Sequence, residues 1–132
     1  MNPLDIIAEY YPVGSEAYRI LVIHSRSVAD KALAIARMHP EMNLDLTFVE
    51  EAAMLHDIGI FRCNAPDIDC HGDAEYICHG YLGAELMRAE GYPRHARVCE
   101  RHTGTGITLA MIEERGLPLP HRDFIRKPWK NN

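Results

Sequence analysis

A histidine followed directly by an aspartate, His56-Asp57, is the feature of this chain whose residue types most clearly suggest chemistry. The pair lies in MLHDIG (54–59), at the end of a predicted helix, where adjacent side chains diverge by about 100°. Side chains in this arrangement can converge on one ion beside the helix, because the imidazole nitrogen and the carboxylate oxygen each supply a bond. The alternative is an exposed carboxylate beside a hydrogen-bonded histidine, and the pair alone does not decide between the two.

Three further histidines lie at positions where the sequence predicts a buried rather than a solvent-exposed side chain. His24 lies between apolar residues such as Ile20 and Ile23 on a predicted helix, while His79 begins one predicted helix and His102 ends the next. A buried histidine needs a polar partner, and a metal ion is one such partner. Taken singly, each of these histidines is more often explained by a hydrogen bond in the core than by a metal. Four histidines on inward faces together with one aspartate favour a metal site.

Helical periodicity dominates the elements that must position these residues, so the sequence predicts an all-α fold. The predicted helices cover residues 3–9, 15–38, 47–59, 79–90, 93–103 and 108–115. Ser15 is the expected N-cap of the long second helix, and Thr47 with Glu50 forms an expected capping box for the third. The expected buried stripe of the second helix consists of Ile20, Ile23, Val28, Ala32 and Ile35. A loop of about eighteen residues (60–77) follows the third helix, a length that is usually functional or mobile.

Composition narrows the classes of protein to which the chain can belong. A length of 132 residues favours a single domain. With 14 basic and 19 acidic residues, the net charge of −5 argues against binding to a nucleic-acid duplex. No apolar run is long enough to span a membrane, and the N-terminus lacks a signal-peptide pattern. Four cysteines without such a signal predict reduced thiols and a cytoplasmic location.

Four segments, taken in order, resemble the HD-domain superfamily of metal-dependent phosphohydrolases, specifically its small members with an HDIG signature. The segments are His24-Ser25, AAMLHDIG (52–59), HGYLGAELMRAEGYP (79–93) and ERHTGTGIT (100–108). The resemblance implies a bundle of about six helices with a central site for one or two divalent transition-metal ions. The implied ligands are His24, His56, Asp57, His79 and His102. A shell of imidazole and carboxylate suits Fe, Mn, Zn, Co or Ni.

The resemblance also implies an activity, which is hydrolysis of a small phosphorylated substrate, a nucleotide being expected, by a metal-activated water. His56 and Asp57 are the implied catalytic residues. Arg62 and Arg101 flank the metal motifs and are candidates for binding substrate phosphates. Because the same scaffold serves di-iron oxygenases, that activity is an alternative, as are a metal-binding module without catalysis and an interaction protein. The expected partner is a small molecule, with no membrane, and a homo-oligomer is left open.

The C-terminal sequence departs from the family pattern, which continues with a helix that carries a further aspartate. We expect residues 1–125 to form one HD domain that lacks its last helix, and residues 126–132 to be a tail foreign to the family. One nucleotide restored after the Ile125 codon would change the tail to Ile-Pro-Glu-Thr-Leu-Glu-Glu-Gln, a good helix start, so a frameshift is one hypothesis. The other is a short family member with Asp69, Asp123 or water in place of the missing ligand.

Overall fold

The predicted all-α fold is confirmed by the computed structural model, which describes residues 1–104 and 108–123. Within these residues the α-helices are α1 (Pro3–Tyr10), α2 (Glu16–Met38), α3 (Leu46–Leu55), α4 (His79–Ala89), α5 (Pro93–Gly104) and α6 (Leu109–Arg115). Short 3-10 helices are η1 (Pro40–Met42), η2 (Ile58–Arg62), η3 (Pro66–Ile68) and η4 (Tyr76–Cys78). Two-residue strands are β1 (Asn64–Ala65) and β2 (Cys70–His71). The tail 126–132, and with it the frameshift hypothesis, lies outside the described residues.

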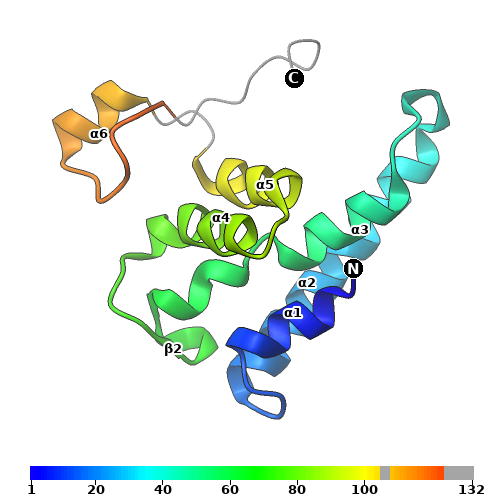
Figure 1. Cartoon of the computed structure of the whole chain (residues 1–132), viewed down its shortest axis with the longest axis horizontal. Helices are drawn as coiled ribbons and strands as arrows, with labels where there is room; N and C mark the ends of the chain where they lie inside the picture. The colour runs from blue at the N-terminus through cyan, green and yellow to red at the C-terminus, as the bar shows by residue number, and fades with distance from the viewer. Residues whose placement is uncertain (105–107, 124–132) are drawn as a thin grey trace.

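The helices form two packed groups that meet at the HDIG segment. Helix α2 runs alongside α3, α1 lies beside the N-terminal part of α2 and also contacts α3, and α4 runs alongside α5 (Figure 1). The short helix η2 packs against α4 and connects the two groups. The main apolar cluster draws on all of these elements, while a smaller one joins α4 to α6 and to Leu119. No helix in the described part of the chain is long and apolar enough to cross a membrane.

Helix α2 begins as predicted but buries a different face. The Ser15 side chain accepts a hydrogen bond from the backbone N–H of Tyr18 at 3.1 Å, which caps the helix. Its buried residues are Leu21, Ser25, Ala29, Leu33 and Ala36. The predicted stripe is therefore wrong for Ile23 and Ile35, which are 59% and 60% exposed, whereas Val28 and Ala32 are half-buried against the main apolar cluster. Apolar residues occur on more than one face of this helix, and the small residues Ser25 and Ala29 mark the face that packs inward.

Helix α3 begins earlier and ends earlier than its sequence suggests. Asp45, not Thr47, is the N-cap, because its carboxylate accepts a hydrogen bond from the N–H of Phe48 at 3.2 Å. This carboxylate provides the acceptor that the capping box was expected to provide. The α-helix ends at Leu55, so the predicted extension to Gly59 is wrong. The chain turns at Asp57 and continues as the tighter helix η2.

The segment predicted as a long loop is tied together by backbone hydrogen bonds. Strands β1 and β2 pair antiparallel, with Asn64 opposite His71. Beyond β2, the N–H of Gly72 donates to Cys63 O at 3.0 Å, and the N–H of Ala74 donates to Arg62 O at 3.1 Å. A Cβ atom on Gly72 would lie 2.1 Å from the carbonyl carbon of Arg62, so this approach requires glycine. The segment thereby leads the chain back to the start of α4.

Candidate metal centre

Asp57 lies at the point where four histidines from different helices converge. The Nε2 atoms of His24 and His56 both lie 3.1 Å from Asp57 Oδ2. On the other side, the Nε2 atoms of His102 and His79 lie 2.9 and 3.3 Å from Asp57 Oδ1. The structure therefore brings together all five residues that the sequence assigned as ligands. Their binding of a metal stays a prediction.

The five residues form two groups, each able to hold a cation, and Asp57 belongs to both. One group is His24, His56 and Asp57, and the other is Asp57, His79 and His102. Within each group, one donor atom per residue lies within 4.8 Å of the others. Each carboxylate oxygen of Asp57 faces its own pair of imidazoles. This is the arrangement that a carboxylate shared by two metal ions requires.

Backbone carbonyls fix the orientation of three of the four imidazoles. In each case, the ring Nδ1 lies at hydrogen-bond distance from the carbonyl oxygen three residues earlier. The pairs are His56 with Ala53 at 2.5 Å, His79 with Tyr76 at 2.7 Å, and His102 with Cys99 at 2.7 Å. Because a carbonyl can only accept, Nδ1 carries the proton, and the Nε2 of the neutral ring presents a lone pair to Asp57.

These lone pairs make the cluster unfavourable unless positive charge lies within it. The Nε2 atoms of His79 and His102 face one another at 3.2 Å, and both also face the Asp57 carboxylate. Without a metal ion, this positive charge would have to come from protonated imidazoles: burial disfavours the charged form of Asp57, but hydrogen bonds donated by His102, His56 and His79 then outweigh burial and lower the pKa of Asp57 well below its usual range. Burial likewise opposes the charge on His56, whose pKa is nevertheless raised by Asp57. A divalent cation supplies the required charge without protonating the imidazoles.

The donor atoms are also spaced as ligands of a transition metal would be. Metal bonds to imidazole nitrogen or carboxylate oxygen are about 2.0–2.2 Å long, so two ligands at a right angle lie roughly 3 Å apart. The distances of 2.9 to 3.3 Å around Asp57 match this value. Imidazole and carboxylate donors suit Fe, Mn, Zn, Co or Ni, and the geometry does not select among these metals.

The site is buried on one side and open on the other. The side chains of His79, Asp57 and His56 are 4%, 9% and 11% exposed. In contrast, the His102 side chain is 25% exposed and that of His24 is 53% exposed. The expectation that His24 is buried is therefore wrong, because it flanks the buried face of α2 rather than lying on it. The more exposed side of the centre is therefore the side of His24 and His102.

Two facing glycines place the HDIG segment directly against α4. A Cβ atom on Gly59 would lie 2.2 Å from the carbonyl oxygen of His79 and 2.5 Å from the backbone nitrogen of Gly83. A Cβ on Gly83 would in turn lie 3.2 Å from the nitrogen of Gly59. Contact this close brings Asp57, two residues before Gly59, within reach of His79. The contribution of Gly83 is not evident from the sequence, because nothing in its local pattern reveals which helix α4 faces.

A buried tyrosine far away in the sequence fastens the turn that follows Asp57. Tyr11, at the end of α1, is 2% exposed. Its hydroxyl donates to Ile58 O at 2.8 Å and accepts from the N–H of Phe61 at 2.9 Å. It thus satisfies one backbone group at each end of η2. Nothing in the sequence around Tyr11 indicates that its hydroxyl bonds to the backbone of Ile58 and Phe61.

Replacing Tyr11 with phenylalanine is expected to weaken metal binding as well as folding. The variant leaves Ile58 O and the Phe61 N–H without their partner, which costs about 1–3 kcal/mol of unfolding free energy. Because the freed turn carries Asp57, metal affinity measured by competition with a chelator should fall too. Tyr10→Phe is the matched control. It removes a hydroxyl from the neighbouring residue of α1, and this hydroxyl donates to the Glu90 carboxylate at 2.8 Å rather than to the backbone of η2. Equal loss of metal affinity in both variants would contradict the role given to Tyr11.

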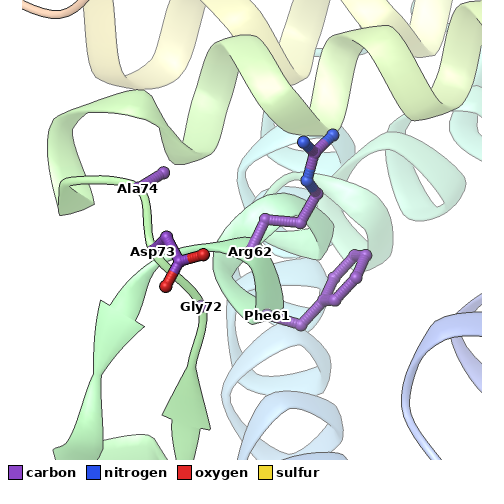
Figure 2. A pocket seen from close by; sticks show the side chains of 5 residues that line it. All are labelled: Phe61, Arg62, Gly72, Asp73 and Ala74. Carbon is purple, nitrogen blue, oxygen red and sulfur yellow. The ribbon is translucent and has the colours of Figure 1, made fainter.

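The two predicted substrate-binding arginines lie outside the histidine cluster. Arg62 is exposed at the end of η2 and lines an open pocket of ≈ 520 Å³ with Phe61, Gly72, Asp73 and Ala74. Figure 2 shows that Phe61 and Arg62 come from one side of this pocket and the segment Gly72–Ala74 from the other. Arg101 lies on α5 directly before His102. Their binding of substrate stays a prediction.

Neither aspartate proposed as a replacement for the missing ligand reaches the centre. Asp69 is exposed and its carboxylate contacts His71 Nε2 at 2.9 Å, in the turn between β1 and β2. The carboxylate of Asp123 accepts a hydrogen bond from the N–H of Leu109 at 2.8 Å, at the start of α6. Both residues are committed to local contacts. Of the three replacements considered, water is the one that these contacts do not exclude.

The four cysteines are free thiols, as the sequence predicts, and all are buried. Burial raises the pKa of Cys99 to about 12 and that of Cys63 to about 11. Neutral thiols are poor nucleophiles. Among the described residues, the two groups able to hold a cation consist of histidines and Asp57, with no cysteine.

Comparisons with known proteins agree with this arrangement. The family model described as "HD domain" matches residues 21–127, which include all five converging residues. The chain is 33% identical over 116 residues to the tRNA (cytidine(56)-2'-O)-methyltransferase of Thermoplasma volcanium, and 31% identical over 107 residues to that of Picrophilus torridus. It is 37% identical over 108 residues to an uncharacterized protein of Methanocaldococcus jannaschii.

These matches cover most of the chain but only part of each relative. They include 87% of this chain for the Thermoplasma protein and 80% for each of the other two. The chain spans 29% and 27% of the length of the two methyltransferases, and 56% of the Methanocaldococcus protein. No solved structure matches the chain significantly.

Proposed function

The chain belongs to the HD domain family, a superfamily of metal-dependent hydrolases, and on this premise we propose that it hydrolyses a phosphoester bond in a small phosphorylated molecule, such as a nucleotide. One observation carries the proposal. Asp57 presents each carboxylate oxygen to a separate pair of histidines, at 2.9 to 3.3 Å. That geometry suits two neighbouring cations, the arrangement used in many enzymes that displace groups at phosphorus.

Each residue of the centre has a distinct role in the proposed metal binding. His24 and His56 would hold one ion and His79 and His102 the other, with Asp57 shared. When bound, one or two ions of Fe, Mn, Zn, Co or Ni would activate a water molecule and stabilise charge on the phosphoryl oxygens. The backbone carbonyls behind His56, His79 and His102 keep each ring in the tautomer that can bind a cation. No serine or cysteine nucleophile is required.

The openness of the site fits a soluble small-molecule substrate. His24 and His102 border the solvent-facing side, whereas His79 and Asp57 form the buried base. Arg101 precedes His102 on α5, and Arg62 ends the helix that follows Asp57, so both extend from segments that hold ligands. We assign these two arginines to the substrate phosphates, which guanidinium groups bind with paired hydrogen bonds.

The experiment is a hydrolysis screen of the metal-loaded protein. The chain is stripped with chelator and reloaded separately with Mn²⁺, Fe²⁺, Co²⁺, Ni²⁺ or Zn²⁺. Phosphate release is then followed on nucleoside mono-, di- and triphosphates and on sugar phosphates. We expect release with at least one metal, and its loss in His56→Ala. Release unchanged in His56→Ala would place the activity elsewhere, and absence of release from every substrate would overturn the proposal. Oxygen consumption without phosphate release would instead identify a di-iron oxygenase.

A second candidate substrate is a phosphate group derived from RNA. Two relatives are named as methyltransferases that modify a ribose 2'-oxygen of tRNA, and the chain matches under a third of each. A domain joined to such an enzyme meets RNA phosphates and their breakdown products. The net charge of −5 argues against tight binding to intact duplex RNA. Nucleoside 2',3'-cyclic phosphates and 2'-phosphates added to the screen test this candidate, and activity confined to 5'-phosphates would exclude it.

A further inference from the structure

The aromatic ring of Tyr76 lies directly against a histidine of the metal centre. Tyr76 begins η4, three residues before His79, and its carbonyl oxygen accepts the hydrogen bond from His79 Nδ1. The two ring centroids are 4.3 Å apart with a tilt of 37°. His79 Nε2, at the edge of the same imidazole, lies 3.3 Å from Asp57 Oδ1. The Tyr76 ring and the shared carboxylate therefore both contact the imidazole of His79.

This ring is unusual among the aromatic side chains of the described residues because it is exposed. Tyr76 is 51% exposed, whereas every other tyrosine and phenylalanine in the ranges 1–104 and 108–123 is buried or half-buried. Burying an aromatic ring is favourable, so leaving half of one in water has a cost. The two neighbouring residues that end η4, Ile77 and Cys78, do pack into the apolar cluster beside α4. Tyr76 alone in this short helix turns outward at the metal centre.

We propose that Tyr76 is a stacking platform for the planar base of the substrate, which makes the substrate a nucleotide rather than a phosphorylated sugar. This inference rests on the proposed function, because it places the phosphate at the histidine cluster. A nucleotide carries its base only one ribose ring away from its phosphate, and the exposed Tyr76 ring contacts the same imidazole whose Nε2 faces Asp57. Stacking on an aromatic side chain accepts any base, because every base has a flat π-face.

A purely structural role for Tyr76 makes a different prediction. If the ring only supports His79, its removal would loosen the imidazole and lower metal affinity, with no distinction between ligands. If the ring stacks with a base, its removal would weaken only ligands that carry a base. The Tyr76 carbonyl remains in every variant, so the hydrogen bond to His79 Nδ1 is retained in both cases. The two roles are therefore separable by choosing ligands that differ only in the base.

The test compares AMP with ribose 5-phosphate, which share the same phosphoester. Dissociation constants are measured by calorimetry on metal-loaded wild type, Tyr76→Ala and Tyr76→Phe, with metal content determined for each protein. We expect wild type to bind AMP about 5-fold or more tightly than ribose 5-phosphate, given the energy of base stacking. The preference should disappear in Tyr76→Ala and persist in Tyr76→Phe, because phenylalanine keeps the flat ring.

The following binding results would overturn the stacking role. Equal binding of both ligands to wild type, or a preference that survives in Tyr76→Ala, would show that the ring does not contact the base. Reduced metal content in Tyr76→Ala, with both ligands weakened equally, would show support of His79 instead. Loss of the preference in Tyr76→Phe would assign recognition to the hydroxyl. Binding requires no turnover, so a Tyr76-dependent preference without phosphate release would refute the hydrolase while leaving the stacking role intact.

Discussion

Replacing Asp57 with asparagine is expected to remove all bound metal from the protein at once. Asparagine keeps the size of the side chain but removes the negative charge that both groups of histidines share. Breaking a buried charged contact of this kind costs about 3–5 kcal/mol, so affinity should fall roughly 100-fold or more. Metal content measured by mass spectrometry after dialysis should therefore be near zero, and any phosphate release should be lost with it.

If Asp57 is shared by two metal ions, replacing a single histidine should remove less metal than replacing Asp57. His79→Ala alters only the Oδ1 side and His24→Ala only the Oδ2 side, so each should lower the metal stoichiometry rather than abolish binding. Asp69→Asn is the matched control, since this carboxylate contacts His71 away from the centre and its loss should leave metal content unchanged. If Asp57→Asn retained half of the metal, the carboxylate would serve one ion only and the two-ion arrangement would be wrong.

Replacing Gly59 with alanine is expected to be among the most destabilising small changes in the chain. The added methyl group would lie 2.2 Å from His79 O and 2.5 Å from the Gly83 nitrogen, both of them backbone atoms. Neither atom can move without shifting α4, so we expect a loss of about 3 kcal/mol of unfolding free energy. For a domain of this size, that loss corresponds to a fall in Tm of roughly 10 °C. Thermal unfolding followed by circular dichroism measures it.

The control for Gly59→Ala is Gly14→Ala, which changes a glycine in open space. A Cβ atom on Gly14 would meet nothing within 4 Å, and the cost arises only from its φ of +92°. We expect about 1 kcal/mol for that backbone strain. Because α4 carries His79, Gly59→Ala should also weaken metal binding in the fraction that stays folded, while Gly14→Ala should not. Similar effects in both variants would show that η2 and α4 can separate at little cost.

The sequence contained enough to predict the helices and to name the residues that converge at the centre. Cap and terminator residues act locally, so Ser15 and Pro40 marked the ends of α2 correctly. The five converging residues were identifiable because they lie, in order, in the segments that resemble the HD-domain superfamily. The buried face of α2 was not predictable, because its choice depends on which small residues let α3 approach. The need for glycine at position 83 was not predictable either, because it arises from the close contact between Gly83 and Gly59 in the folded protein.

Contacts between distant segments were the other information that the sequence did not hold. Tyr11 and Ile58 are 47 residues apart, and no periodic pattern relates a hydroxyl in one to a carbonyl in the other. Asp45 took the capping role expected of Thr47 because either residue is a suitable N-cap and tertiary packing selects between them. Local signals thus placed the site residues, while packing determined how far each one is exposed.

The hydrogen bonds of Tyr11 extend the set of residues that support the metal centre beyond the region that the family model matches. The region recognised as an HD domain starts at residue 21, yet the residue that clamps both ends of η2 precedes it. The Tyr11 residue that follows helix α1 therefore supports the turn that carries Asp57, although it lies outside the region that the family model matches. A fragment cut at residue 21 would keep the five converging residues and still lose the hydroxyl that holds this turn.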